Sequence, residues 1–150
     1  MKSHFFAYIA RMRYITRWAL MRNTFSENVQ EHSHMVAVLA HALAVIRNRV
    51  YGGQIDAGQV AAAALYHDAS EIITGDMPTP IKYYAPEIRD AYNKLSAYIK
   101  CVEELKAGNA EFRRAAEQIR TALDAMHLPE LDYFMEHCAE SFSMTLDELE

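Results

Sequence analysis

Apolar side chains recur at helical spacing along nearly the whole chain, and no stretch alternates apolar and polar residues long enough to predict a strand. The first such stripe contains Phe5, Ile9 and Met12 and predicts a helix from Phe5 to about Ile15. We therefore expect an all-α fold.

The second predicted helix begins at Asn28, whose side chain can cap it while Glu31 reaches back in a capping box. It runs to about Arg47 and carries His32 in its first turn. Gly52-Gly53 then breaks the chain.

The third predicted helix begins at Asp56, with Gln59 at the matching capping position, and ends near Gly75. It is the helix that carries His67 and Asp68. Further helices are predicted from Pro86 to Gly108, from Ala110 to about Met126 and from Pro129 to about Ser141, followed by a short terminal turn.

A loop rich in proline follows the third helix, because Pro78 and Pro80 forbid its continuation. This loop places Asp76 and Thr79 just past the end of the helix that carries His67 and Asp68. Both side chains could overhang the same site.

Composition limits the classes of function. The chain has 150 residues, 51% of them hydrophobic, which suits one globular domain with a single core. A net charge of -5 with no long basic block disfavours a nucleic-acid polymer as partner. Apolar stretches are too short for a membrane span and the N-terminus is too interrupted for a signal peptide, so we expect a cytoplasmic protein. Cys101 and Cys138 follow no paired spacing and receive no role.

The most informative feature is the pair His67-Asp68 inside the apolar run Val60–Ile73, where two ionisable groups are costly to bury without compensation. A divalent first-row cation accepts imidazole and carboxylate ligands, and helix neighbours about 100° apart can reach one ion. His32 could supply a third ligand, and Glu71 lies one turn beyond the pair. These residues predict a metal-dependent enzyme.

Each of these residues also has a purely structural interpretation. His67-Asp68 could be a histidine-carboxylate hydrogen bond in the core, but the joint pattern with His32, Glu71 and the acidic loop favours a metal site. The remaining histidines, His4, His34, His41, His127 and His137, are interpreted as surface or structural side chains.

On these residues the chain resembles the HD-domain phosphohydrolases, named for a histidine-aspartate pair, and within them the bacterial 5′-deoxynucleotidases of the YfbR type. The matching segments span both ends of the chain: Arg17-Trp18, Leu20–Asn23, Glu27–Val29, Glu31–Ser33, Tyr66–Glu71, Thr74–Asp76, Pro78–Pro80, Ala97-Tyr98 and Asp132–Met135. The resemblance implies a single helical HD domain.

The resemblance also implies a metal site and its chemistry. A divalent cation such as cobalt or manganese would be held by His32, His67 and Asp68. Glu71 would orient or deprotonate the attacking water. Asp76 would bond a sugar hydroxyl or help to protonate the leaving 5′-oxygen, and the sequence leaves this choice open.

The implied substrates are deoxyribonucleoside 5′-monophosphates, and the implied assembly is a homodimer. Arg17 suits bidentate contact with phosphate, although a salt bridge is its ordinary role. Trp18 could exclude a 2′-hydroxyl from the sugar site, although core packing is its ordinary role. Thr79 and Pro80 complete the expected substrate site.

One departure from the family is visible. The family has a fourth ligand, an aspartate, where this chain has Asn93, and about forty residues that precede that aspartate have no counterpart here. Either the printed sequence omits a segment near residues 92–94, or the protein has lost it. We favour omission, because an amide is a weaker ligand than a carboxylate and the rest of the site looks intact.

Two rival functions stay open at this point. One is a non-catalytic nucleotide-binding HD protein with a degenerate metal site, which a true loss of the fourth ligand would favour. The other is a different HD phosphohydrolase, acting on cyclic or tetraphosphate nucleotides, against which Arg17-Trp18 and the proline-rich loop argue.

Overall fold

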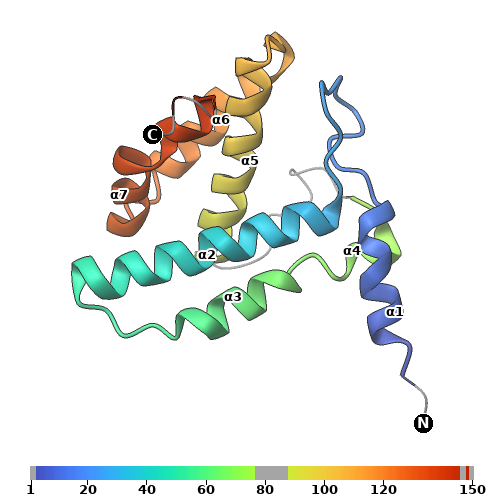
Figure 1. Ribbon diagram of the computed structural model, residues 1–150, viewed down its shortest axis with the longest axis horizontal. Coiled ribbons are helices and arrows are strands. Elements are labelled where there is room, and N and C mark those ends of the chain that lie inside the picture. The colour runs from blue at the N-terminus through green and yellow to red at the C-terminus, as the bar shows by residue number, and fades with distance from the viewer. Residues whose placement is uncertain (1–2, 77–87, 146–147, 149–150) are drawn as a thin grey trace.

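The computed structural model describes residues 3–76, 88–145 and 148 of the chain (Figure 1). These residues contain only helices and one isolated antiparallel bridge, between Thr16 and Asn28, so the predicted all-α fold is confirmed. The α-helices are α1 (Phe5–Ile9), α2 (Val29–Tyr51), α3 (Ala57–Leu65), α4 (Glu71–Thr74), α5 (Ile88–Lys106), α6 (Arg113–Asp124) and α7 (Pro129–His137). Short 3-10 helices are η1 (Ala10–Tyr14), η3 (Ala110–Phe112) and η4 (Ala139–Ser143).

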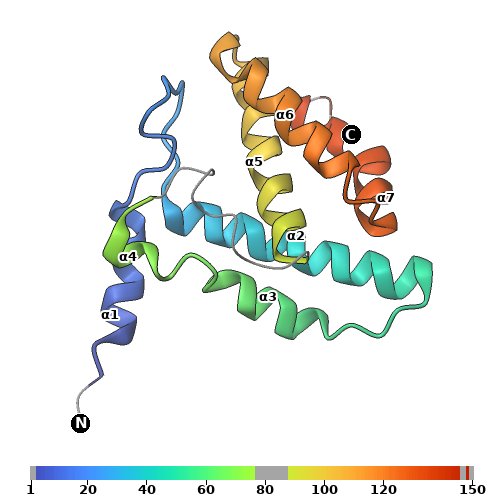
Figure 2. The same cartoon turned by 180° about the vertical axis from the view of Figure 1, so that it is seen from behind.

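Helix α2 is the axis of the molecule. Figures 1 and 2 show α3 lying along α2 and α5 crossing it, with α6 running beside α5. Helix α1 lies near the N-terminal end of α2. The main core forms where these helices meet, from Val36, Leu39, Leu43, Ala64, Leu95, Ile99, Leu123, Leu131 and Phe134. The described helices include none that is both long and apolar enough to cross a bilayer.

The helix starts follow the predicted caps. The Asn28 side chain accepts a hydrogen bond from the Glu31 amide at 3.0 Å, and the Glu31 carboxylate accepts one from the Asn28 amide at 3.0 Å. Such a cap is worth about 1 kcal/mol and fixes the first turn of α2. The helix continues past the predicted end near Arg47 to Tyr51, because Gly52 supplies the left-handed residue that ends it, at φ 68°.

The prediction of one helix from Asp56 to Gly75 was wrong beyond Leu65. Asp56 caps α3 as expected, but residues 66–70 form turns before α4 begins at Glu71. The amide of His67 bonds the Ala64 carbonyl at 3.4 Å, a tighter spacing than that of an α-helix. The His67 Nδ1 atom reaches the same carbonyl at 2.7 Å, so the side chain takes the acceptor that helix continuation requires.

The other predicted helices are found with small changes. The first tightens into η1 after Ile9, and α5 matches the predicted long helix from Ile88 onward, whereas Pro86 lies outside the described residues. The stretch from Ala110 begins as η3 and continues as α6, and Pro129 occupies the first turn of α7 as expected.

A buried ion pair ties residues 24–25 to α5. Lys100 is 2% exposed and Glu104 is 0% exposed, and their side chains bond at 2.7 Å. Glu104 also accepts hydrogen bonds from the Thr24 amide, the Thr24 hydroxyl and Asn109 Nδ2, while Lys100 donates to the Phe25 carbonyl at 3.0 Å. A paired and fully hydrogen-bonded charge is tolerated in a core.

These contacts make the stability of the fold depend on pH in the acid range. Burial raises the pKa of Glu104, but hydrogen bonds from Lys100, Thr24 and Asn109 outweigh it and lower that pKa from 4.5 to about 2. Because the folded pKa lies below the unfolded value, the charged carboxylate stabilises the fold above about pH 4.5. That contribution, up to about 3 kcal/mol, is lost as the pH falls from there toward 2.

We therefore predict that Glu104→Gln lowers the free energy of unfolding at neutral pH by roughly 3 kcal/mol, since it leaves the Lys100 ammonium buried without a counterion. The difference from wild type should shrink in acid, because below about pH 4.5 the unfolded wild-type chain takes up a proton on this carboxylate and the wild type loses stability. Urea unfolding near neutral pH and near pH 3 measures both effects. Glu136→Gln, at an exposed position on α7, is the control, and equal stabilities of wild type and Glu104→Gln at neutral pH would contradict the assignment.

Candidate active site

The structure brings His32, His67 and Asp68 together from two parts of the chain. Asp68 Oδ2 lies 3.1 Å from His67 Nε2 and 3.5 Å from His32 Nε2. One ligand atom from each of the three residues lies within 4.8 Å of the other two, and all three side chains are less than a tenth exposed. The first turn of α2 supplies His32, and the turn after α3 supplies the other two.

The His67 ring is oriented by the backbone. Its Nδ1 atom bonds the Ala64 carbonyl, which can only accept, so Nδ1 carries the hydrogen and Nε2 of the neutral ring presents a lone pair. That Nε2 atom is buried without a hydrogen-bond partner among the described residues and faces the Asp68 carboxylate. A cation between the two would satisfy both, and a histidine ligand with its other nitrogen on a carbonyl is the usual arrangement at a metal.

The His32 ring is held from α5. Ser96 Oγ lies 3.3 Å from His32 Nδ1, and Asn93 Oδ1 lies 3.2 Å from His32 Nε2. Bonds of about 2.0–2.2 Å from one divalent cation put neighbouring ligand atoms about 3 Å apart. The separations of Asp68 Oδ2 from the two histidine nitrogens, 3.1 and 3.5 Å, therefore fit ligands of a single ion, and the Asn93 amide oxygen lies 3.2 Å from His32 Nε2.

Arg17 joins the cluster to Asp76. Its Nη1 atom lies 3.7 Å from Asp68 Oδ2 and 3.6 Å from Asp76 Oδ1, while its Nε atom donates to Glu27 Oε2 at 3.1 Å. Nη1 is buried and has no hydrogen-bond partner among the described residues. Arg17, the residue predicted to bind phosphate, thus lies beside the candidate metal ligands, and its Nη1 atom can still donate a hydrogen bond.

Trp18 is half-buried and adopts a left-handed backbone conformation, with φ 58°. Its indole Nε1 donates to Glu27 Oε2 at 3.1 Å, and its ring packs against Phe112 with centroids 5.5 Å apart. The residue therefore has both a packing contact and a polar anchor. A bulky residue with positive φ is uncommon, and strained backbone of this kind clusters at active sites and ligand contacts.

Of the other predicted site residues, Glu71 lies near the cluster, whereas Thr79 and Pro80 are not described by the structure. Glu71 is 2% exposed and begins α4, and its amide donates to the Asp68 carbonyl at 2.9 Å. It is thus a turn away from the ligand cluster, in a separate helix and not on the helix that was predicted. Thr79 and Pro80 lie outside the described residues.

The other histidines lie away from the cluster. All five are exposed, in agreement with the surface or structural roles predicted for them: His4, His34, His41, His127 and His137. His34 in particular lies on the opposite side of α2 from His32, which is 2% exposed.

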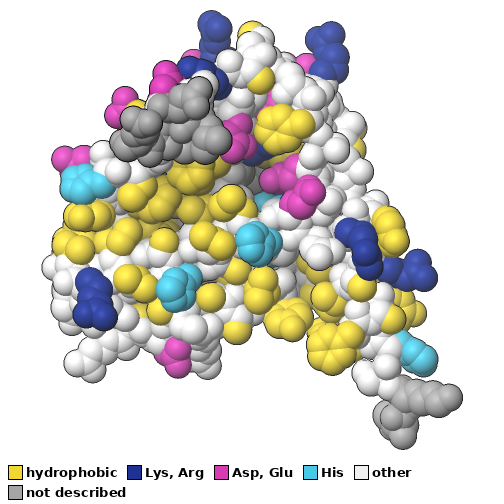
Figure 3. Space-filling view, in the orientation of Figure 1, with side chains coloured by type: hydrophobic (Ala, Val, Ile, Leu, Met, Phe, Trp, Pro, Cys, Tyr) yellow, Lys and Arg dark blue, Asp and Glu magenta, His cyan; other side chains and the backbone are white. Residues whose placement is uncertain are grey.

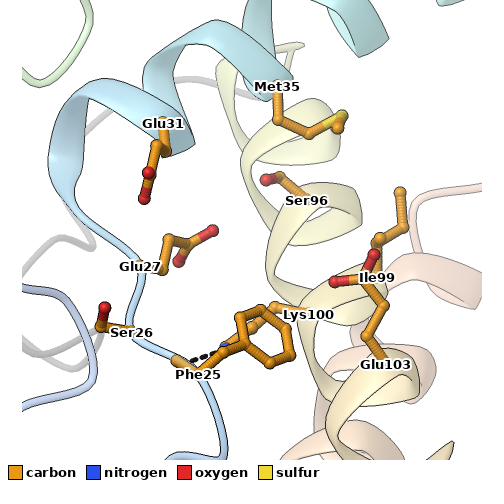
Figure 4. Close-up of a pocket in the computed structure, with 9 residues that line it drawn as sticks. All are labelled: Phe25, Ser26, Glu27, Glu31, Met35, Ser96, Ile99, Lys100 and Glu103. Carbon is orange, nitrogen blue, oxygen red and sulfur yellow. Dashed lines mark hydrogen bonds between the residues drawn. The ribbon is translucent and has the colours of Figure 1, made fainter.

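A cavity of about 260 Å³ lies behind the first turn of α2, between that turn, residues 25–27 and α5 (Figure 4). Glu27 and Glu31 line one wall and Ser96 the other. The cavity adjoins the candidate site, because Ser96 bonds His32 and Glu27 bonds Arg17.

Glu27 and Ser96 were missed by sequence reasoning. Glu27 precedes a helix cap, where a carboxylate ordinarily serves the helix dipole, and its contacts to Arg17 and Trp18 span about ten residues. Ser96 could have been found from its spacing, since it lies three residues after Asn93 on the same helix.

The sequence comparisons all match this chain to 5′-deoxynucleotidases. The family model described as 5′-deoxynucleotidase YfbR-like matches residues 4–96 and 93–142. A 5′-deoxynucleotidase of Vibrio vulnificus is 42% identical over 191 positions, covering 99% of this chain and 98% of that protein. Another, from Pectobacterium atrosepticum, is 42% identical over 191 positions, covering 99% and 96%. Since this chain has 150 residues, at least 41 of the 191 positions have no residue of this chain opposite them.

Two solved structures share the architecture. An HD-domain phosphohydrolase from Listeria innocua matches with a TM-score of 0.77 at 17% identity, covering 93% of this chain and 88% of that one. The HD phosphohydrolase of cyanophage S-2L, solved with dA and one catalytic Zn²⁺, matches with a TM-score of 0.65 at 22% identity, covering 94% and 98%. These likenesses confirm the predicted HD-domain fold, and with the sequence matches they establish that the chain belongs to the YfbR-like 5′-deoxynucleotidase family.

Proposed function

We propose that this chain hydrolyses deoxyribonucleoside 5′-monophosphates in a metal-dependent reaction. The water oxygen bonds to phosphorus, the bond from phosphorus to the 5′-oxygen breaks, and the leaving oxygen takes up a proton. The observation that carries the proposal is the convergence of His32, His67 and Asp68 beside the Nη1 atom of Arg17. The names of the 42% identical relatives and the dA and Zn²⁺ in the cyanophage structure support it.

The metal would be held by His32, His67 and Asp68, with Asn93 beside them. A bound divalent cation supplies charge neutralisation at the phosphate oxygens and activation of water. Imidazole and carboxylate ligands suit first-row cations, and we propose cobalt or manganese among them.

Substrate binding would use the residues around that centre. Arg17 presents a planar fork that matches two phosphate oxygens, and its Nη1 atom has donor capacity for one of them. Asp76, at 3.6 Å from Arg17, would bond a sugar hydroxyl or protonate the leaving oxygen. Trp18 would exclude a 2′-hydroxyl, and Thr79 and Pro80 would complete the sugar site.

The first expected result concerns metal dependence. Phosphate release from a panel of deoxy- and ribonucleoside 5′-monophosphates should disappear after chelation and return when Mn, Co, Mg or Zn is added. Bound metal, measured by elemental analysis, should fall and recover in parallel. Activity that survives complete removal of metal would refute the proposal, and metal and nucleotide binding without turnover would favour the non-catalytic alternative.

Glu71 is proposed to handle the proton of the attacking water. Glu71→Ala should keep metal and nucleotide binding but slow turnover by about 10²-fold or more, whereas Asp68→Ala should lose the metal. Glu71→Gln keeps the size of this buried side chain and guards against a folding defect. Kinetics combined with metal analysis separates the roles, and equal loss of metal from Glu71→Ala and Asp68→Ala would make Glu71 a ligand.

The two family matches meet at Asn93, where the sequence predicts a missing segment. The family matches overlap at residues 93–96, and at least 41 aligned positions lack a counterpart in this chain. We propose that about forty residues belong at this junction. An intact mass of 17.1 kDa for the protein from its natural source would show instead that the printed chain is whole.

If the chain is whole, the Asn93 amide oxygen takes the fourth ligand position. Asn93→Asp should then tighten metal binding by about tenfold or more, because it adds a negative charge beside the cation, and Asn93→Leu should weaken it. Competition against a chelator measures the affinity. Gln118→Glu makes the same charge change at an exposed position on α6 and should have no effect. Unchanged affinity in both Asn93 variants would exclude this role.

We also propose a homodimer in the cytoplasm. Figure 3 shows hydrophobic side chains gathered in a band over α2 and α3. Large apolar side chains at this surface and on α1 are well exposed, among them Phe6 at 72% and Val38 at 49%. Apolar surface of this kind is typical of association sites, and light scattering of the intact protein measures the assembly.

A further inference from the structure

We propose that Glu27 is a positioning residue that holds Arg17 and Trp18 as one unit, and that it thereby sets both the affinity for the phosphate and the discrimination between sugars. The proposal rests on the proposed function in one respect, namely that Arg17 and Trp18 contact the substrate. Glu27 acts through these two side chains, to which its carboxylate is hydrogen-bonded.

The contact that carries the proposal is made by a single oxygen atom. Glu27 Oε2 accepts from Arg17 Nε at 3.1 Å and from Trp18 Nε1 at 3.1 Å. The side chains of Arg17 and Glu27 are only 10% and 16% exposed, so water competes weakly for these bonds. Hydrogen bonds to a carboxylate are about twice as strong as those between neutral groups.

The backbone fixes Glu27 relative to the ligand cluster. The Arg17 amide donates to the Glu27 carbonyl at 2.8 Å, and an antiparallel bridge joins Thr16 to Asn28. Asn28 is the cap of α2, which carries His32 in its first turn. A shift of Glu27 would therefore move Arg17 and Trp18 relative to His32.

Trp18 needs such an anchor because of its backbone. A φ of 58° is costly for a bulky residue and persists only where surrounding contacts enforce it. The carboxylate of Glu27 holds the indole, and Asn23 Nδ2 donates to the Trp18 carbonyl at 3.2 Å. Trp18 is thus held both at its indole nitrogen and at its backbone carbonyl. A side chain that excludes a 2′-hydroxyl by steric contact requires such a fixed position.

Arg17 needs Glu27 for an electrostatic reason. Two other carboxylates, Asp68 and Asp76, lie 3.7 and 3.6 Å from its Nη1 atom. With Nε anchored to Glu27, the guanidinium stays at a distance where Nη1 makes no hydrogen bond to either. Without that anchor Arg17 would close onto Asp68 or Asp76, and the donor available to phosphate would be lost.

The test uses Glu27→Gln and Glu27→Ala, with Glu31→Gln as the matched control. Glu31 lines the same cavity and caps α2, a role that glutamine can also fill, and it bonds neither Arg17 nor Trp18 in the structure. Trp18 is the only tryptophan of the chain, so its fluorescence reports on this site directly. Thermal unfolding of each variant checks the fold, and Glu27→Gln carries the test if Glu27→Ala is unstable.

We expect both Glu27 variants to shift the Trp18 emission to longer wavelength and to increase its quenching by acrylamide. KM for a deoxyribonucleoside monophosphate should rise about tenfold, with kcat changed less, and the deoxy-to-ribo ratio of kcat/KM should fall. Metal affinity should change less than KM, since Glu27 is not itself a proposed ligand and acts on Asp68 only through Arg17. Glu31→Gln should match wild type in each of these measurements.

Wild-type emission in the folded Glu27 variants would overturn the proposal, and so would a shifted emission with unchanged KM and an unchanged deoxy-to-ribo ratio. A wild-type protein that hydrolyses no nucleotide would contradict the proposed function instead. In that event the emission shift still decides whether Glu27 holds Trp18. The two failures are therefore distinguishable.

Discussion

The Nε2 atom of His67 is held 3.1 Å from the Asp68 carboxylate, and both side chains are less than a tenth exposed. With a neutral ring, the Nε2 lone pair and the carboxylate repel each other at this distance, and the repulsion grows as the local dielectric constant falls. The Ala64 carbonyl prevents the ring from turning its donor toward Asp68, because it already engages Nδ1. The site is therefore built for a positive charge, and the helix break after Leu65 is the local cost of that geometry.

The surroundings of the cluster alternate in charge. Asp68 and Asp76 face the Arg17 guanidinium, which in turn is anchored by Glu27. Behind this layer the Lys100–Glu104 pair fastens residues 24–25 to α5, the helix that also supplies Ser96 and Asn93 to the site. One helix thus braces both the metal-ligand cluster and the segment that leads to Glu27, so stability and site geometry share the same contacts.

The sequence was informative where a local rule decides the structure. The caps at Asn28 and Asp56 follow from residue chemistry and short spacing, and residue type alone pointed to His32, His67 and Asp68, which the structure brings together. The break between α3 and α4 does not, because the periodicity of the run Val60–Ile73 carries no sign that a side chain, His67, will take a backbone acceptor. The role of Glu27 depends on a bridge between Thr16 and Asn28, twelve residues apart, outside the reach of a capping or helix-spacing rule.

The Asn93 amide changes the electrostatics of the centre in two opposing directions. With a carboxylate at that position the site would carry two formal negative charges, whereas here only Asp68 contributes one, with the Arg17 cation 3.7 Å away. At an effective dielectric constant near 20, one unit charge about 4 Å away is worth about 4 kcal/mol, so the hold on a dication is weakened appreciably. The same missing charge leaves a bound dication less neutralised and more attractive to a phosphate dianion. If the chain is whole, an amide at this position would therefore weaken metal retention without removing the electrostatic basis for phosphate binding, and metal occupancy would limit activity.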